Sequence, residues 1–143
     1  LGQSPRIVTF DQSTRTSELA AAAIGCTVGQ IAKSLIFRAK RSDRPVLVIA
    51  CGDNRVDEKK LRALVGEKIG RADPEFVRER TGFAIGGVAP VGHTERIATY
   101  LDTGLWVHDI VWAAAGAPSA VFETTPEALL AMTGGAKADI AVE

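Results

Sequence analysis

A lysine and a run of glycines are the residues of this chain whose types and spacing most clearly suggest chemistry. Lys33 interrupts the apolar stretch Ile31–Phe37, where it could offer a point charge to an anionic ligand such as a phosphate. The segment Gly82–His93 holds four glycines, which let the backbone approach a ligand and point successive N–H groups at an anion or a carbonyl. Each feature has a structural alternative: a lysine whose stem packs on the core, and a tight loop that reverses the chain.

Thiol and imidazole groups are few, and they form no familiar catalytic arrangement. The cysteines and histidines are Cys26, Cys51, His93 and His108, and their spacing fits no zinc signature, so we expect no metal site. A nucleophilic Cys51 would need a histidine partner and a lowered pKa; the alternative is a small packed side chain. His108 and Asp109 would point to opposite faces of a strand and would not form an oriented pair.

Composition restricts the remaining classes of protein. The chain has 143 residues, 46% of them hydrophobic, and its 17 basic side chains balance 17 acidic ones. This mix is that of a globular protein, and the charge balance disfavours nonspecific binding to long DNA. Apolar runs such as Val46–Cys51 are far shorter than the ~20 residues of a membrane helix, and the N-terminus lacks a signal-peptide pattern. We expect one domain over residues 1–143, located in the cytoplasm.

The elements that must position these residues alternate between strands and helices. The sequence predicts a helical turn over Val28–Lys33, directly before Lys33 enters a strand, and a hairpin loop over Lys40–Arg44. Capping residues and terminal glycines delimit four helices. The predicted helices cover 17–24, 57–65, 74–82 and 126–133, and the predicted strands cover 6–10, 34–39, 45–51, 69–72, 109–115, 120–122 and 139–142. This order predicts a mixed α/β (α+β) fold rather than a regular βαβ array.

Taken together, these segments resemble the YbaK/prolyl-tRNA synthetase-associated domain family of aminoacyl-tRNA editing deacylases. Lys33 in IAKSLIF matches the characteristic lysine of that family, and Gly86–Pro90 (GGVAP) matches its GxxxP loop, followed by Gly92. The connecting text GDNRVDEKKL and ADPEFVRERTGFAIGG agrees with the family pattern, as do Val111–Pro118 and Ala138–Ile140. The resemblance covers nearly the whole chain from Ile7 onward.

The resemblance implies a compact domain around a curved mixed sheet, and hydrolysis of the ester that joins a wrong, small amino acid to tRNA, often tRNA(Pro), in trans. Lys33 would be the catalytic residue that holds the terminal adenosine or its phosphate. The implied substrate-binding residues are Ser34, Gly86, Gly87, Val88, Ala89, Pro90, His93 and Gly116. No cofactor and no metal is implied. The partners would be the acceptor end of a mischarged tRNA and, secondarily, prolyl-tRNA synthetase, without DNA or a membrane.

Two departures from the family pattern and two alternatives accompany this prediction. Ala113–Ser119 is richer in alanine than in some members, and Phe10 stands where some have tyrosine, which puts a cysteine-specific activity in doubt. The alternatives are a non-catalytic module that binds tRNA ends or nucleotides, and a Cys51-dependent hydrolase. A basic cluster around the hairpin could meet an acceptor stem or could simply be a solvated loop; it comprises Arg38, Lys40, Arg41 and Arg44.

Overall fold

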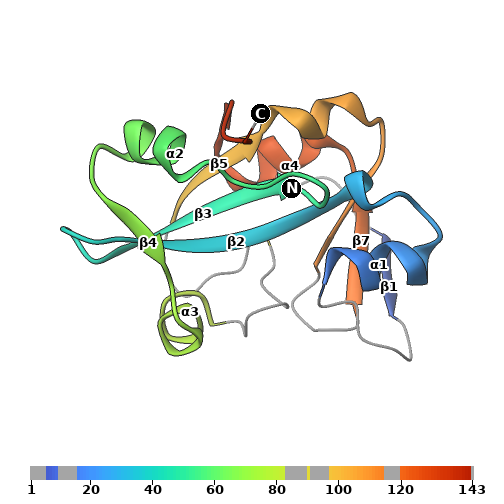
Figure 1. Ribbon diagram of the computed structural model, residues 1–143. Coiled ribbons are helices and arrows are strands. Elements are labelled where there is room, and N and C mark those ends of the chain that lie inside the picture. The colour runs from blue at the N-terminus through green and yellow to red at the C-terminus, as the bar shows by residue number, and fades with distance from the viewer. Residues whose placement is uncertain (1–5, 10–15, 83–89, 91–96, 115–119, 143) are drawn as a thin grey trace.

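The computed structural model describes residues 6–9, 16–82, 90, 97–114 and 120–142 (Figure 1). Its strands are β1 (Arg6–Thr9), β2 (Ile31–Ala39), β3 (Arg44–Cys51), β4 (Ile69–Arg71), β5 (Ala98–Asp102), β6 (Val111–Ala114), β7 (Ala120–Thr124) and β8 (Ala136–Ala138). Its α-helices are α1 (Ser17–Ile24), α2 (Glu58–Val65), α3 (Pro74–Thr81) and α4 (Pro126–Thr133). Two short 3-10 helices, η1 (Val28–Gln30) and η2 (Thr103–Val107), complete the described elements.

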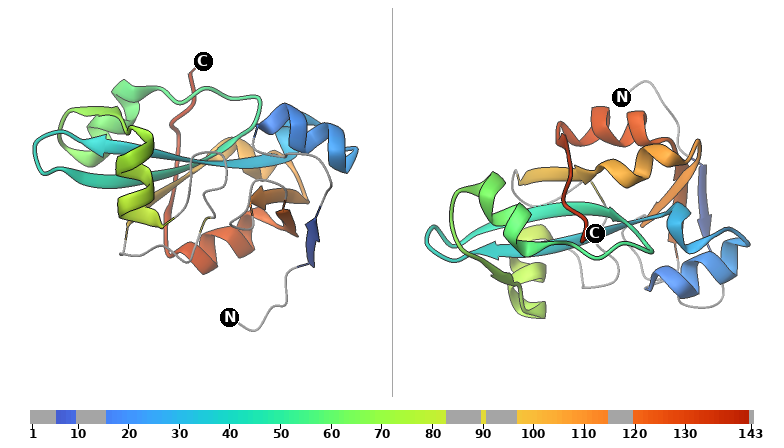
Figure 2. Two further views of the ribbon diagram at one scale, coloured as in Figure 1. Left: turned by 90° about the horizontal axis from the view of Figure 1, so that it is seen from below. Right: turned by 45° about the horizontal axis from the view of Figure 1, so that its top comes forward.

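All eight strands belong to one mixed sheet, which confirms the predicted fold class. The order is β1-β7-β6-β2-β3-β5-β8, and β4 pairs with β2 beside this path. The pairs β2–β6, β3–β5 and β5–β8 are parallel, and the others are antiparallel. The long β2–β3 hairpin runs across the molecule, with α1 near one end and the hairpin loop at the other (Figures 1 and 2).

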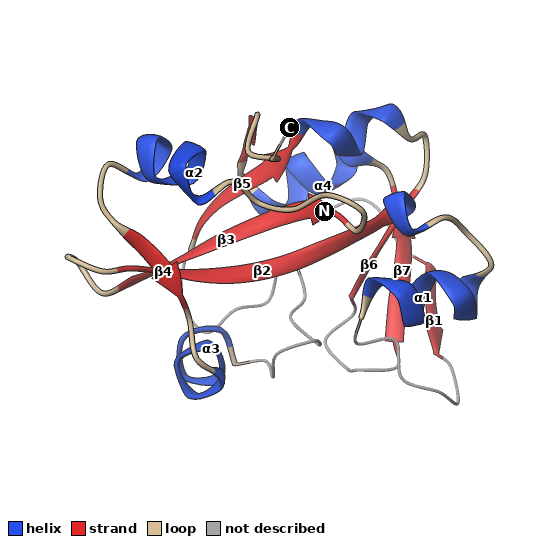
Figure 3. Ribbon diagram, viewed as in Figure 1, coloured by secondary structure: helices blue, strands red, loops and turns tan. Residues whose placement is uncertain are grey.

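The four α-helices begin and end where the sequence predicts, because capping side chains and glycines fix their ends. Each helix starts at a side chain that accepts a hydrogen bond from a backbone N–H of the first turn. The capping residues are Thr16, Asp57, Asp73 and Thr125. Each helix ends at a glycine in the left-handed conformation, which L side chains adopt only with strain. Figure 3 shows these helices around the sheet.

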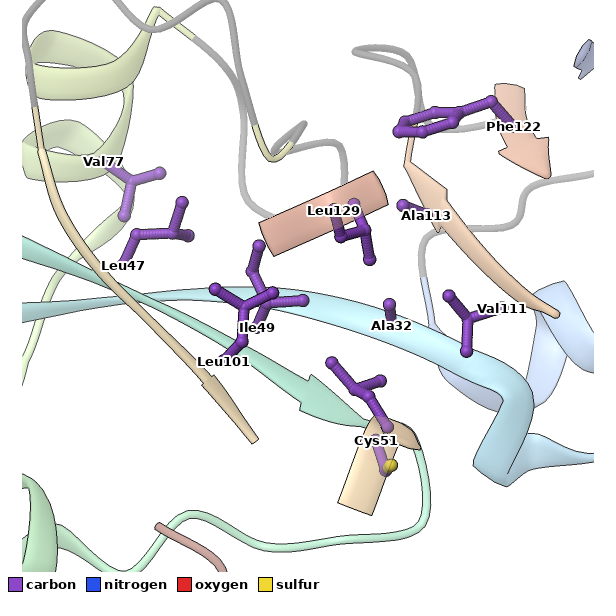
Figure 4. Close-up of a cluster of buried hydrophobic side chains, with 11 residues drawn as sticks. Ala32, Leu47, Ile49, Cys51, Val77, Leu101, Val111, Ala113, Phe122 and Leu129 are labelled. Carbon is purple, nitrogen blue, oxygen red and sulfur yellow. The ribbon is translucent and has the colours of Figure 1, made fainter. Parts of the chain in front are cut away.

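The β2–β3 hairpin is buried on both faces, and each face has its own core. Val77 of α3 and Leu129 of α4 pack with Leu47 and Ile49 on one face (Figure 4). Leu61 of α2 packs with residues of the opposite face, among them Val46, Val48 and Ile140. The placement of α2 and α3 on opposite sides of the hairpin follows from the period-two alternation of strand side chains (Figure 1).

One edge of β2 is divided between two partners. Ile31 and Ala32 pair with β6, and Phe37–Ala39 pair with β4. No strand among the described residues pairs with 33–36 on this edge, while β3 covers the other edge throughout. Among the described residues, the divided edge leaves the β2 backbone beside Lys33 and Ser34 without a strand partner, so a ligand can approach there.

Several boundaries predicted from the sequence are wrong, among them the start of β2 and the end of β7. The helical turn predicted over Val28–Lys33 ends at Gln30, and Lys33 is the third residue of β2. The last strand is β8, at Ala136–Ala138, rather than Asp139–Val142, because Ile140 is buried in the core from a segment outside any strand. The strand predicted from Asp109 starts at Val111, and β5 is not among the predicted strands.

Candidate functional site

A cavity of about 560 Å³ lies at the divided edge of β2. Its wall comes from β2 itself, from the start of α1, from the segment after β3, and from the ends of β4 and β6. The lining polar residues are Thr16, Ser17, Lys33, Ser34, Arg55, Glu58 and Arg71, and the apolar lining includes Ile36, Ala72, Val77, Trp112, Ala113 and Val121. A cavity of this size, apolar with a few polar groups, has the character of a small-ligand site.

Lys33 contributes a held ammonium group to this cavity. Its Nζ donates a hydrogen bond of 2.6 Å to the Asn54 carbonyl oxygen and a longer one of 3.5 Å to that of Gly52. Both acceptors are neutral, and within the described part of the chain no carboxylate forms a salt bridge with Lys33. The positive charge is therefore held in place without being offset by an anionic side chain.

Ser34 lines the same cavity from the opposite face of β2, because successive strand residues alternate. Its Oγ is buried and has no hydrogen-bond partner in the structure. A buried hydroxyl without a partner costs about 1–3 kcal/mol, so such a group in a cavity wall suggests a contact made only with ligand. Because Lys33 and Ser34 lie on opposite faces of β2 and both line the cavity, the cavity extends around the edge of this strand.

The turn that holds Lys33 is itself fixed by a buried carboxylate. Asp102, at the end of β5, is 1% exposed and accepts hydrogen bonds from Cys51 N (3.2 Å), Asn54 Nδ2 (2.8 Å) and Gly104 N (2.9 Å). This network joins the ends of β3 and β5. Neither Asn54 nor Asp102 was predicted from the sequence; the only signal for Asn54 was the GDN turn after a strand, and Asp102 had none.

The predicted substrate-binding residues are only partly placed. Lys33 and Ser34 come together at the cavity, and Pro90 is buried. The other predicted residues lie outside the described residues; they are Gly86, Gly87, Val88, Ala89, His93 and Gly116. Arg55, in the segment after β3, and Arg71, the last residue of β4, line the cavity and were not predicted.

Cys51 does not have the properties of a nucleophile. Its side chain packs in the core at the end of β3 (Figure 4). Burial raises the pKa of the thiol to about 12, and the Asp102 and Asp53 carboxylates add to the increase, while Lys33 opposes it. The thiol is therefore protonated at neutral pH, which counts against the Cys51-dependent hydrolase.

The described residues contain neither a cluster of metal ligands nor a membrane-spanning helix. No group of three or more His, Cys, Asp or Glu side chains among these residues could hold a metal ion. No described helix combines the length and the apolar character needed to cross a membrane.

Only part of the basic cluster at the hairpin end is engaged with acidic side chains. Arg38 forms an ion pair with Asp43, which Arg80 also approaches at 3.4 Å. Both guanidinium groups lie over the Phe76 ring, about 5 Å from its centre. The neighbouring Glu67 accepts hydrogen bonds from the backbone N–H groups of residues 41 and 42. Arg38 is thus engaged, whereas Lys40, Arg41 and Arg44 are exposed, as the solvated-loop alternative expects.

The chain belongs to the aminoacyl-tRNA editing domain family, whose sequence model matches residues 11–132. A crystal structure of a candidate trans-editing enzyme for prolyl tRNA synthetase matches with a TM-score of 0.91 and 47% identity, over 97% of this chain and 87% of that one. The family match confirms the resemblance predicted from Lys33 and the glycine-rich segment. It places the chain in a class of enzymes that deacylate aminoacyl-tRNA.

Curated relatives agree with this assignment. The uncharacterised protein YwhH of Bacillus subtilis is 39% identical over 123 residues, 86% of this chain and 78% of that protein. A candidate Cys-tRNA(Pro)/Cys-tRNA(Cys) deacylase of Enterococcus faecalis, EbsC, is 29% identical over 87% of this chain and 76% of its own length. A proline–tRNA ligase of Thermosipho melanesiensis is 33% identical over 91 residues, which are 63% of this chain and 16% of the ligase.

Proposed function

We propose that this protein removes a small, wrongly attached amino acid from the 3′ end of tRNA(Pro), acting in trans as a single domain in the cytoplasm. The observation that carries the proposal is the Lys33 ammonium, held at a cavity by two neutral carbonyls. The similarity to proline–tRNA ligases and to named trans-editing proteins supports tRNA(Pro) as the substrate and the synthetase as a partner.

Lys33 binds the anionic part of the substrate in this proposal. The ester links the amino acid to the terminal adenosine, whose 5′ side carries a phosphate. With two of its contacts made to Asn54 and Gly52, the ammonium retains donor capacity for a phosphate or ribose oxygen. A preformed charge of this kind positions the ester without reorganisation during the reaction.

The hydrolytic step relies on positioning rather than on a side-chain nucleophile. Among the described residues that line the cavity there is no cysteine or histidine. Water attack on the ester carbonyl requires donors for the developing oxyanion, and the backbone N–H groups of Gly86–Ala89 are our proposed source. The terminal hydroxyl of the tRNA would assist the attacking water.

Selectivity follows from the size of the cavity wall that meets the amino acid. One methylene more or less in an apolar pocket changes binding by about 1–3 kcal/mol, which favours small side chains modestly. The apolar lining of Ile36, Val77 and Ala113 and the buried Ser34 hydroxyl provide a mixed surface for such a group. We propose that Ser34 contacts the aminoacyl moiety.

The test is a deacylation assay on tRNA(Pro) charged in turn with alanine, cysteine, serine, 2-aminobutyrate and proline. The proposal expects one small amino acid to be released faster than in buffer, with proline spared and Lys33→Ala slowed by about 100-fold or more. Binding of tRNA without turnover of any ester would contradict it and would support the non-catalytic module, which the absence of a cysteine or histidine from the described cavity lining favours. An unchanged rate of deacylation in Lys33→Ala would reject the role of Lys33.

A further inference from the structure

Asp102 is a buried carboxylate whose hydrogen bonds join the end of β3 and the turn after it to the start of η2. It is 1% exposed, and in the described part of the chain no basic side chain forms an ion pair with it. An unpaired buried charge is costly unless hydrogen bonds satisfy it, and three N–H donors do so here. Such a costly group requires an account beyond packing.

The donors of Asp102 lead directly to Lys33. One is the Asn54 side-chain amide, and another is the backbone N–H of Cys51, at the two ends of the turn that follows β3. The carbonyl oxygens of this same turn, at Gly52 and Asn54, accept from the Lys33 ammonium. A continuous chain of hydrogen bonds therefore runs from the Asp102 carboxylate through Asn54 to Lys33.

Close packing on both sides leaves this turn little freedom to move. A Cβ atom at Gly52 would lie 2.4 Å from the Val28 carbonyl oxygen, which shows how closely the turn lies against η1. A Cβ atom at Gly104 would lie 2.8 Å from Asn54 Nδ2 and 3.2 Å from Asp102 Oδ1. Glycine at these two positions lets the backbone approach and keeps the Asn54 amide on the carboxylate.

We propose that Asp102 and Asn54 are positioning residues that aim the Lys33 ammonium at the substrate. Asp102 orients the turn through the Asn54 amide, and the turn presents neutral carbonyls instead of a carboxylate to Lys33. A carboxylate in direct contact would fix the lysine equally well but would cancel its charge. The Asp102 carboxylate acts through Asn54 and does not itself contact Lys33. The ammonium is therefore held in place and still available to an anion.

This inference rests on the proposed function for its kinetic consequence, and Asn54→Ala tests it. The variant removes the amide that bonds Asp102 but keeps the backbone carbonyl that Lys33 contacts. Because a displacement of about 1 Å can reduce catalysis about 100-fold, we expect kcat/KM for deacylation to fall about tenfold or more. Thr125→Ala is the control, because it also removes one side-chain hydrogen bond, accepted from the Ala128 N–H at the start of α4, outside the cavity lining.

A double-mutant cycle separates positioning from a general loss of structure. If Asn54 acts through Lys33, Asn54→Ala causes no further loss in the Lys33→Ala background. An equal fold-loss in both backgrounds would overturn the proposal. Gly104→Ala supplies a second perturbation, because its methyl group would displace the Asn54 amide without altering any polar group. We expect it to reproduce the kinetic loss of Asn54→Ala.

A measurement that does not depend on catalysis tests this inference separately from the proposed function. The ¹⁵N relaxation of the Lys33 ammonium reports how firmly it is held, with the exposed Lys59 as an internal reference. We expect an ordered Lys33 group in the native protein and in Thr125→Ala, and order close to that of Lys59 in Asn54→Ala. Unchanged order in Asn54→Ala would overturn the inference. A wild-type protein that orders Lys33 in this way but deacylates no tRNA would overturn only the proposed function.

Discussion

The two ends of strand β2 each carry a fixed cation, and the two are held by opposite means. At the hairpin end, Arg38 pairs with the Asp43 carboxylate and stacks on Phe76. At the cavity end, Lys33 is held by the carbonyl oxygens of Gly52 and Asn54. Both side chains are ordered by their partners, but only the partner of Arg38 carries a negative charge.

This difference separates structural cations from cations that can bind a substrate. The Asp43 carboxylate offsets the charge of Arg38, so the electrostatic attraction that Arg38 could exert on a further anion is small. The dipoles of two carbonyls fix Lys33 but leave its unit charge, which in a partly buried site acts more strongly than in bulk water. The comparison teaches that the partner of a basic side chain, more than its exposure, indicates whether the charge is available.

The same criterion revises the predicted RNA contact. The sequence analysis considered Arg38, Lys40, Arg41 and Arg44 as a surface for the acceptor stem. Arg38 is paired with a carboxylate, and Arg44 lies 4.0 Å from Glu67. Lys40, Arg41, Arg55 and Arg71 form no ion pair within the described part of the chain. Of these, Arg55 and Arg71 line the cavity together with Lys33, so they are the better candidates for phosphate contacts.

Apart from Lys33→Ala, the largest effect on substrate binding is expected for Arg55→Ala and Arg71→Ala. Each would raise KM about three- to tenfold and lower the slope of log KM against log salt by about one, the signature of a lost phosphate contact. Steady-state deacylation at several salt concentrations measures both quantities. Arg62→Ala, at an exposed arginine of α2 outside the cavity lining, is the control and should change neither. Equal KM and slope in all three variants would contradict the phosphate role.

Ser34→Ala is expected to separate activity from stability. Removing the unpartnered buried hydroxyl should leave the free energy of unfolding unchanged or raise it by about 1 kcal/mol, while kcat/KM falls up to about tenfold. Urea denaturation and the deacylation assay give the two values. A loss of stability without loss of activity would show that the hydroxyl serves the fold, contrary to our account.

Glu67→Gln tests whether the Glu67 carboxylate stabilises the hairpin end, through the pH dependence of unfolding. Hydrogen bonds from the backbone N–H groups of Ser42 and Arg41 lower the pKa of Glu67 against the opposing effect of burial. A carboxyl whose pKa is lower in the folded state stabilises the fold above its unfolded pKa, about 4.3, and this contribution is lost as pH falls through the folded pKa. Unfolding measured from neutral pH down through this range should show a weaker pH dependence in Glu67→Gln. An unchanged dependence would contradict the assigned role, and activity at neutral pH should stay the same.

The smallest kinetic effect is expected for Cys51→Ala. With a thiol pKa of about 12, Cys51 holds no appreciable thiolate at neutral pH, so kcat/KM should stay within about twofold of the wild-type value. The loss of one buried sulfur atom should reduce the free energy of unfolding by about 1 kcal/mol. Loss of activity in a fully folded Cys51→Ala protein would contradict this expectation and support the Cys51-dependent hydrolase.

Local signals in the sequence were sufficient for the helices and for the hairpin. Thr16, Asp57, Asp73 and Thr125 each begin a helix that a glycine ends, and both signals act within one turn of the chain. Strands that depend on distant partners were harder to predict. β5 and β8 pair in parallel with each other, and β8 has the sequence AKA, which carries little strand preference of its own.

The candidate site was predictable only where a residue stands out by type. Lys33 and Ser34 were found because a lysine interrupts an apolar run, and both line the cavity. Asn54 and Asp102 were missed because the bond between them spans 48 positions, and no local pattern reports such a contact. The divided edge of β2 likewise depends on the register of β4 and β6, which the sequence does not display.

The most direct test of this account is a paired measurement of Lys33→Ala and Arg38→Ala on the mischarged tRNA that the wild-type protein deacylates best. Circular dichroism would establish that both variants are folded at the assay temperature. We predict that Lys33→Ala loses about 100-fold or more in kcat/KM, as expected for a charged hydrogen bond, while Arg38→Ala stays within about threefold. Equal losses in the two folded variants would contradict the claim that only the cation held by carbonyls is available to the substrate.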